Sequence, residues 1–202
     1  MSGEVLDIFQ VAGLKKPDLS ILSDEFLEDV RRMEYRNLAV ELLERLLKNE
    51  IKAKFRTNVV SKAKFSELLE AALNRYRARA IETAQVIEEM IAMAKEFNEA
   101  AKKGDELGLT SDELAFYDAL STNEASVREL GDPVLKALAQ ELTRKLKASA
   151  AVDWSKRDSV RATMRIKVKH ILSHYKYPPD KAAAAIEMVL KQAEVLSDDW
   201  AS

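Results

Sequence analysis

The chain has 202 residues, and its 32 Lys and Arg against 34 Asp and Glu give a net charge of −2, which argues against a strongly basic nucleic-acid-binding protein and an acidic tail. Because the chain contains no cysteine, disulfides and thiol catalysis are excluded. About half of the residues are Ala, Leu, Glu, Lys and Arg, whereas Gly and Pro number only 5 and 4, so the sequence predicts an all-α fold, a multi-helix bundle.

The N-terminal part is predicted to be a connector, residues 1–36, with short helices. The first helix lies near residues 5–11, a break follows at Gly13 and Pro17, and a second helix begins after Ser23 as its N-cap. The chain carries no signal-peptide pattern, and its longest apolar runs are far shorter than the ~20 residues that span a bilayer. We therefore expect a cytoplasmic protein.

The rest of the chain, residues 37–202, is predicted to be one helical C-terminal domain. Apolar spacing predicts a helix over residues 37–54 and, after an interruption, a second helix from Ser61 to Lys103 with two neighbouring apolar stripes. An unbroken helix of that length would be roughly 64 Å long at 1.5 Å per residue. The sequence therefore predicts one long central helix that is either bent or makes the molecule elongated, and that ends at Gly104 and Gly108.

Four further helices are predicted from caps and proline positions. They are a short helix to Leu120 opened by a capping box at Thr110 and Glu113, a helix over residues 134–148 opened by Asp132 and Pro133, a helix over residues 155–175, and an Ala-rich closing helix over residues 181–196 after Pro178 and Pro179.

Charge is distributed unevenly along the chain. Residues 44–64 carry seven Lys and Arg against two Glu, and residues 156–176 carry seven against one Asp. Residues 82–132 carry thirteen acids and four bases. Such asymmetry favours charged partners and sets their orientation, although pairing inside the molecule would cancel part of it.

The most specific local pattern is a row of four cations at successive i+4 positions beside an apolar helix face. These are Arg157, Arg161, Arg165 and Lys169, called here the cationic stripe. Guanidinium groups pair well with phosphate and carboxylate oxygens, so the stripe fits DNA phosphates or an acidic protein partner. It also fits a plain solvated surface or pairing with acidic residues of the same chain. The pattern alone leaves these interpretations open.

Catalytic and metal-binding motifs are weak throughout the sequence. His170 and His174 lie one helical turn apart, but residue 171 is Ile where a zinc protease has its glutamate base, and no Glu stands three residues before either histidine. We therefore expect no metal site and an ordinary surface role for both histidines.

Two fragments imitate enzyme motifs. The pair Pro17-Asp18, followed by Glu50 and Lys52, resembles the magnesium-holding elements of restriction nucleases, but these need adjacent strands and here fall in a helical pattern. Residues 112–115 (DELA) imitate a helicase acidic box, yet a capping box explains them and no Gly-rich phosphate loop is present. Neither fragment predicts catalysis by this chain.

Several longer stretches form a recognisable set. They are residues 7–9 (DIF), 19–27 (LSILSDEFL), 37–43 (NLAVELL), 79–89 (RAIETAQVIEE), 112–120 (DELAFYDAL), 152–154 (VDW), 160–162 (VRA) and 177–181 (YPPDK), closing on Trp200. Together they resemble the C-terminal helical region of the restriction subunit of type I restriction-modification enzymes, and the resemblance covers nearly the whole chain.

The resemblance implies a non-catalytic C-terminal assembly domain. In that family the nuclease and the ATP-driven DNA translocase lie upstream, so ATP and Mg are expected only there and no cofactor is expected in this fragment. The C-terminal region is associated with docking the motor onto the methyltransferase and specificity subunits, and DNA is met through the whole complex. Two alternatives stay open, namely a DNA-contacting clamp that assists translocation and a structural spacer that packs on the motor domains.

Overall fold

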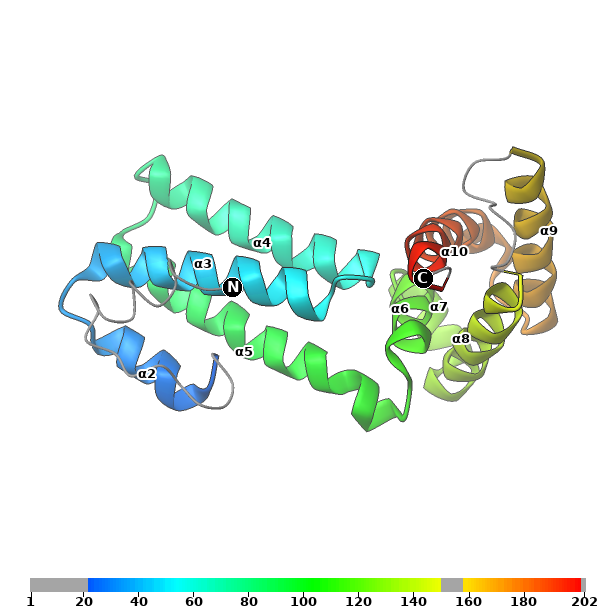
Figure 1. Cartoon of the computed structure of the whole chain (residues 1–202), viewed down its shortest axis with the longest axis horizontal. Coiled ribbons are helices and arrows are strands. Elements are labelled where there is room, and N and C mark those ends of the chain that lie inside the picture. Colours follow the sequence, from blue (N-terminus) through cyan, green and yellow to red (C-terminus); the bar gives the residue numbers. More distant parts are fainter. Residues whose placement is uncertain (1–21, 150–157, 201–202) are drawn as a thin grey trace. The chain divides into compact units, whose positions relative to one another are not determined.

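The computed structural model describes residues 22–149 and 158–200 of the chain. Within these ranges all regular structure is helical, without strands, so the predicted all-α multi-helix fold is confirmed (Figure 1). The helices are α2 (Asp24–Arg32), α3 (Arg36–Lys54), α4 (Val59–Arg77), α5 (Thr83–Leu107), α6 (Ser111–Leu120), α7 (Glu124–Leu130), α8 (Asp132–Lys147), α9 (Asp158–His174) and α10 (Pro179–Trp200). None of them is both long and apolar enough to cross a membrane.

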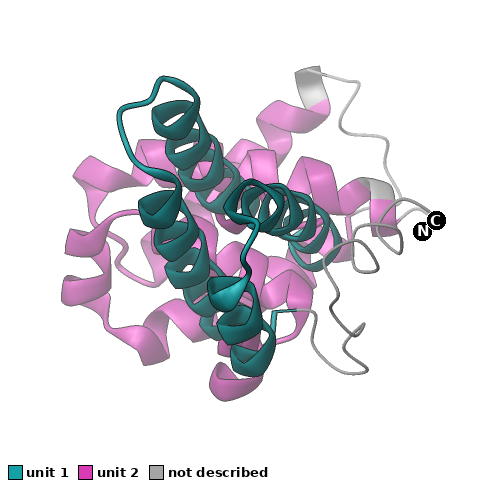
Figure 2. Cartoon of the chain, turned by 90° about the vertical axis from the view of Figure 1, so that its left-hand side faces the viewer, with its two compact units in different colours: residues 1–55, 62–101 teal, residues 56–61, 102–202 magenta. Residues whose placement is uncertain are grey.

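The chain forms two compact units. Unit 1 consists of residues 1–55 and 62–101, and unit 2 consists of residues 56–61 and 102–202 (Figure 2). Helices α4 and α5 therefore contribute residues to both units. Helix α2, which lies before the expected boundary at residue 36, buries its apolar side chains in the same core as α3.

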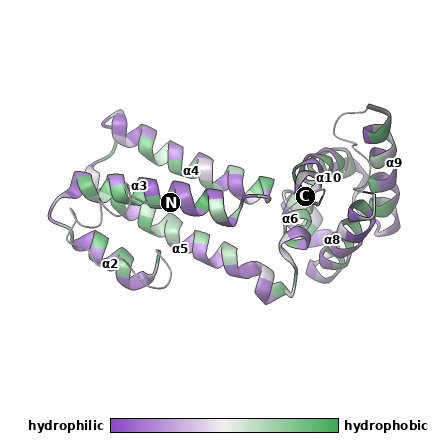
Figure 3. Ribbon diagram, viewed as in Figure 1, coloured by the Kyte–Doolittle hydropathy of each residue, from purple (hydrophilic) through white to green (hydrophobic). Residues whose placement is uncertain are grey.

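Unit 1 is built on the apolar faces of α2 to α5. Along these helices hydrophobic and hydrophilic residues alternate with the helical repeat (Figure 3). At one end of the core Phe55, Phe65 and Phe97 form a ring cluster, with centroids 5.5 Å apart for Phe55 and Phe65, 5.1 Å for Phe55 and Phe97, and 5.5 Å for Phe65 and Phe97. These rings join the end of α3 to α4 and α5 within the unit.

The beginning of α2 confirms the predicted N-cap. The Ser23 hydroxyl accepts from the backbone N–H of Phe26 at 3.3 Å, and the first and last turns carry the acidic and basic residues that the helix dipole favours. The Asn98 side chain of α5 donates to the backbone carbonyl of Leu22 at 2.7 Å. This bond holds the residue before α2 against α5.

The prediction of one long central helix over residues 61–103 is wrong, because the helix ends at Arg77 and α5 begins at Thr83. Arg79 adopts a left-handed conformation with φ 56°. The N–H of Ala80 donates to the carbonyl of Arg75 and the N–H of Arg79 to that of Tyr76, both at 2.9 Å. This is a Schellman termination, whose left-handed position is usually glycine. Arginine there leaves no glycine signal in the sequence.

Helix α9 ends in the same way. Lys176 has φ 56°, the N–H of Tyr177 donates to the carbonyl of Leu172 at 3.0 Å, and the N–H of Lys176 donates to that of Ser173 at 3.1 Å. The helix predicted over residues 155–175 therefore ends at His174, one residue earlier than expected, and Pro179 opens α10 two residues before the predicted start at residue 181.

We expect Arg79→Gly and Lys176→Gly each to raise the free energy of unfolding by about 0.5 to 1 kcal/mol, because glycine carries no Cβ penalty in the left-handed region. Urea denaturation followed by circular dichroism measures the change. Gly108→Ala is the matched control of opposite sign, since Gly108 has φ +63° at the end of α5. A loss of stability in both glycine variants would show that the left-handed conformations of Arg79 and Lys176 are not strained.

Gly104 does not end α5 as predicted, since the helix runs to Leu107 and Gly108 provides the left-handed residue. A Cβ on Gly104 would lie 3.3 Å from the carbonyl oxygen of Leu109 and 3.3 Å from Leu114 Cδ2. Glycine is therefore used here for the close approach of the following turn.

Unit 2 places α6 against α8 and α10, and α9 against α8 and α10. The predicted capping box of α6 is confirmed, because the backbone N–H of Thr110 donates to Glu113 Oε2 at 2.8 Å and that of Glu113 donates to Thr110 Oγ1 at 3.4 Å. Helix α7 was not predicted. Asn123 caps it and Gly131 ends it with φ 74°, so α8 begins directly at Asp132.

The segment 56–61, which links α3 to α4 and includes the first three residues of α4, is fixed within unit 2 by residues from α10. The Arg56 guanidinium donates to both carboxylate oxygens of Asp199, at 3.0 and 2.7 Å. The buried Gln192 side chain accepts from the N–H of Val59 at 2.9 Å and donates to the carbonyl of Thr57 at 2.5 Å. A buried amide that satisfies two backbone groups defines the path of this segment.

Candidate functional site

Helix α9 carries Arg161, Arg165 and Lys169 of the predicted cationic stripe and packs its apolar face against the rest of unit 2. Of the apolar face expected from the spacing, Met164, Val168 and Ile171 are buried and Val160 and Tyr175 are partly buried against the same core; Leu172 is buried with them. Between residues 160 and 174 the helix contains no acidic residue. The charged side chains that this stretch exposes are therefore all basic.

The structure separates the members of the stripe. Arg161 pairs with Glu194 at 3.4 Å and Arg165 pairs with Glu187 at 2.6 Å, both acids lying on α10. Lys169 is exposed and forms no ion pair within the described ranges. Arg157 lies outside the described residues.

The two pairs neutralise part of the stripe without contributing much to stability. All four side chains are about half exposed, and such pairs contribute roughly 0.2 to 1 kcal/mol. The neutralising acids come from α10 and not from the acidic segment 82–132.

The two histidines line a surface groove between α8 and α9. The ring of His174 contacts that of Tyr175 edge to face, with centroids 5.4 Å apart. No cluster of three or more His, Cys, Asp or Glu that fits a metal ion occurs in the part of the chain that the structure describes.

The described residues of the two fragments that imitate enzyme motifs lie in helices of the fold. Glu50 and Lys52 lie on α3, which confirms the helical interpretation, whereas Pro17 and Asp18 lie outside the described residues. In the box of residues 112–115, Asp112 accepts from the indole N–H of Trp200 at 2.7 Å. This carboxylate connects the start of α6 to the end of α10.

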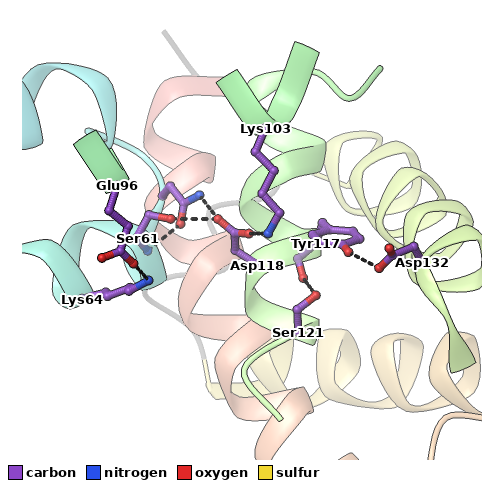
Figure 4. A network of polar contacts seen from close by, with 9 residues as sticks. Ser61, Lys64, Glu96, Lys103, Tyr117, Asp118, Ser121 and Asp132 are labelled. Carbon is purple, nitrogen blue, oxygen red and sulfur yellow. Dashed lines mark hydrogen bonds and ion pairs between the residues drawn. The ribbon is translucent and has the colours of Figure 1, made fainter. Parts of the chain in front are cut away.

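A polar network that the sequence analysis missed is centred on Asp118 of α6 (Figure 4). Its Oδ2 accepts from Asn58 Nδ2 and from Ser61 Oγ, both at 2.8 Å, and its Oδ1 accepts from Lys103 Nζ at 3.0 Å. The side chain is only 11% exposed. With three donors around one carboxylate, Asp118 holds the segment 56–61 within unit 2.

The neighbouring residue Tyr117 donates its hydroxyl to Asp132 at 2.6 Å, and Lys103 Nζ lies 4.7 Å from the centre of its ring. Burial, followed by the hydrogen bond to Asp132, raises the pKa of Tyr117 to about 12. The hydrogen bond joins α6 to the first residue of α8.

We expect this tyrosine to make unit 2 sensitive to alkali. The unfolded chain loses the Tyr117 proton near pH ~10, whereas the native state keeps it until about pH 12, so the stability contribution present below pH ~10 is lost between these values, by at most ~1.4 kcal/mol per pH unit. Urea denaturation across this range measures the loss. Tyr117→Phe should remove this pH-dependent loss, whereas Tyr35→Phe, at an exposed site, should retain it. Equal pH profiles for the wild type and both variants would contradict the prediction.

Comparison with known proteins agrees with the family resemblance. The sequence matches, over residues 1–199, the family described as "Type I restriction enzyme HindI endonuclease subunit-like, C-terminal". It is 40% identical over 195 residues to the type I restriction enzyme HindI endonuclease subunit of Haemophilus influenzae, covering 96% of this chain and 18% of that protein. No solved structure matches the chain.

A second relative is also an endonuclease subunit by name. The putative type I restriction enzyme MjaIXP endonuclease subunit of Methanocaldococcus jannaschii is 36% identical over 172 residues, covering 84% of this chain and 16% of that protein. The chain thus spans less than a fifth of the length of either curated relative.

Proposed function

Because the chain belongs to the family of C-terminal regions of type I restriction enzyme HindI endonuclease subunit-like proteins, we propose that it is a non-catalytic assembly domain. It docks the ATP-dependent DNA translocase and endonuclease of the larger subunit onto the methyltransferase and specificity subunits. The relatives are named endonuclease subunits, and a subunit works within a complex. The cytoplasm is the compartment expected for such an assembly.

The observation that supports protein docking is the mixed character of the exposed face of α9. Ile166 is 58% exposed beside Lys169 and Lys167. An apolar side chain flanked by cations complements a protein partner that presents apolar and acidic side chains together. A surface that follows DNA phosphates needs uncompensated cations, and Arg161 and Arg165 already have carboxylate partners.

The test is to titrate the 202-residue chain with the purified methyltransferase and specificity complex, and separately with duplex DNA, over a range of salt concentrations. We expect tight binding of the complex and weak binding of DNA. The DNA clamp would be favoured if the chain bound DNA tightly and did not bind the complex. The logarithm of its DNA-binding constant should then fall steeply and linearly with the logarithm of the salt concentration. Binding of neither would favour the spacer.

We expect Lys169→Glu to weaken binding of the complex by about tenfold, because it places an acid where an acidic partner approaches. Lys169 is a better test position than Arg161 or Arg165. A Glu at position 161 or 165 would face the carboxylate of its present partner on α10 and could destabilise unit 2. The binding titration measures the effect, and circular dichroism checks that helicity is unchanged. Unaltered affinity would remove Lys169 from the interface.

A further inference from the structure

The groove between α8 and α9 lies on the opposite flank of α9 from its ion pairs with α10. It has a volume of about 590 Å³ and is lined by residues of both helices. Arg144 and Lys145 come from the last turn of α8, and Lys167, His170 and His174 come from α9. Glu141 is the acidic residue among its lining residues.

An apolar strip lies between these cations. Ile171 is buried at the base of the groove, and Ala148 and Ile166 are exposed along it. An apolar side chain that lines a concave surface offers area that an apolar side chain of a partner can bury. Ile166 is therefore suited to contact an apolar side chain of another molecule.

The positive charge of the groove is not cancelled within the described part of unit 2. Glu141 accepts from the Tyr175 hydroxyl at 2.7 Å and pairs with Lys145, and the hydrogen bond from Lys145, followed by that from Tyr175, lowers the pKa of Glu141. This single carboxylate forms its ion pair with Lys145 and also attracts Arg144 electrostatically, so one acid stands against the three cations Arg144, Lys145 and Lys167. Lys167 donates to the hydroxyl of Ser149 at 3.0 Å, which is a neutral acceptor, and Arg144 makes no ion pair with any described residue.

We propose that this groove seats an acidic amphipathic segment of the protein partner, with an apolar side chain on Ile166 and carboxylates on Arg144 and Lys167. The proposal rests on the proposed docking function and names the part of the surface that recognises the partner. Charge complementarity decides the occupant, because Arg144 offers the planar donor pair that fits a carboxylate and Lys167 lacks a charged partner. The apolar strip favours a protein segment over DNA, since a phosphate backbone gives Ile166 no contact.

The first test is the double reversal Arg144→Glu and Lys167→Glu in the 202-residue chain, titrated with the purified methyltransferase and specificity complex. We expect about a hundredfold loss of affinity, roughly tenfold for each reversed charge. Lys191→Glu is the matched control, because Lys191 is an exposed cation of unit 2 without an ion pair in the described ranges, and it should bind as the wild type does. Circular dichroism confirms that all variants are folded.

The second test identifies the occupant by placing a photoreactive phenylalanine derivative at Ile166, with Leu68, the 41% exposed leucine of unit 1, as the control position. We expect a cross-link from position 166 to a segment rich in Asp and Glu, and none from position 68. Wild-type affinity of the double variant, or a cross-link from 166 to DNA, overturns the groove proposal and leaves docking intact. If the wild-type chain itself does not bind the complex, the proposed function fails and the groove proposal fails with it.

Discussion

Replacing Phe97 by Ala is expected to lower the free energy of unfolding of unit 1 by about 3 to 5 kcal/mol, because a fully buried ring is lost and a cavity is left. Phe97 contacts both other rings of the cluster, with centroids 5.1 Å from Phe55 and 5.5 Å from Phe65. Urea denaturation followed by circular dichroism measures the change. Tryptophan fluorescence is less suited to unit 1, because both tryptophans of the chain lie in the sequence range of unit 2.

Two variants control for the loss of packing at this position. Phe97→Leu retains part of the apolar volume and should be less destabilising than Phe97→Ala. Leu68→Ala removes an exposed leucine from the same unit and should change stability by less than about 0.5 kcal/mol. A Phe97→Ala protein as stable as the Leu68→Ala protein would show that the ring cluster does not stabilise the unit.

Replacing Asp118 by Ala is expected to lower the free energy of unfolding of unit 2 by about 2 to 4 kcal/mol, because buried donors lose their acceptor. Asn58, Ser61 and Lys103 all donate to this carboxylate. Tryptophan fluorescence during urea denaturation follows the change, since Trp200 packs on Phe116 with ring centroids 6.4 Å apart.

Asp118→Asn is the informative companion variant, because it retains one acceptor oxygen while removing the negative charge. We expect it to lose less stability than Asp118→Ala, with the remaining loss reflecting the unpaired Lys103 ammonium. If both variants were as stable as the wild type, the network would not be what holds the segment 56–61 within unit 2.

Local signals in the sequence were sufficient wherever a helix begins with its own side-chain cap. Ser23 and the box of Thr110 and Glu113 were predicted correctly, because the donor and acceptor lie three residues apart. The break after α4 was missed because Arg79 occupies a position where the local signal would be glycine, whereas the end of α9 was predicted to within one residue although Lys176 carries no such signal. Tertiary packing sets these conformations and leaves no mark in the periodicity.

For the candidate site, the sequence revealed the cations of α9 and not their surroundings. The i+4 spacing of Arg161, Arg165 and Lys169 was visible, but the pairing of Arg165 with Glu187 depends on how α9 packs against α10. The contribution of Arg144 from α8 to the other flank depends likewise on packing. Pairings between separate helices are not encoded in any local pattern.

Asp118 did leave a signal that could have been used. It stands among buried neighbours of α6, with Phe116, Ala119 and Leu120 all fully enclosed. A carboxylate in such a run is rarely buried without a partner, so its position predicts a polar network. The partners Asn58 and Lys103 are distant in sequence and required the structure.

The most direct test of protein docking is the light-scattering mass of the 202-residue chain on a sizing column, alone and mixed with the purified methyltransferase and specificity complex from the same source. The docking account predicts a co-eluting species whose mass is the sum of the chain and the complex. Separate elution at the masses of the two components, with both shown to be folded, would contradict it.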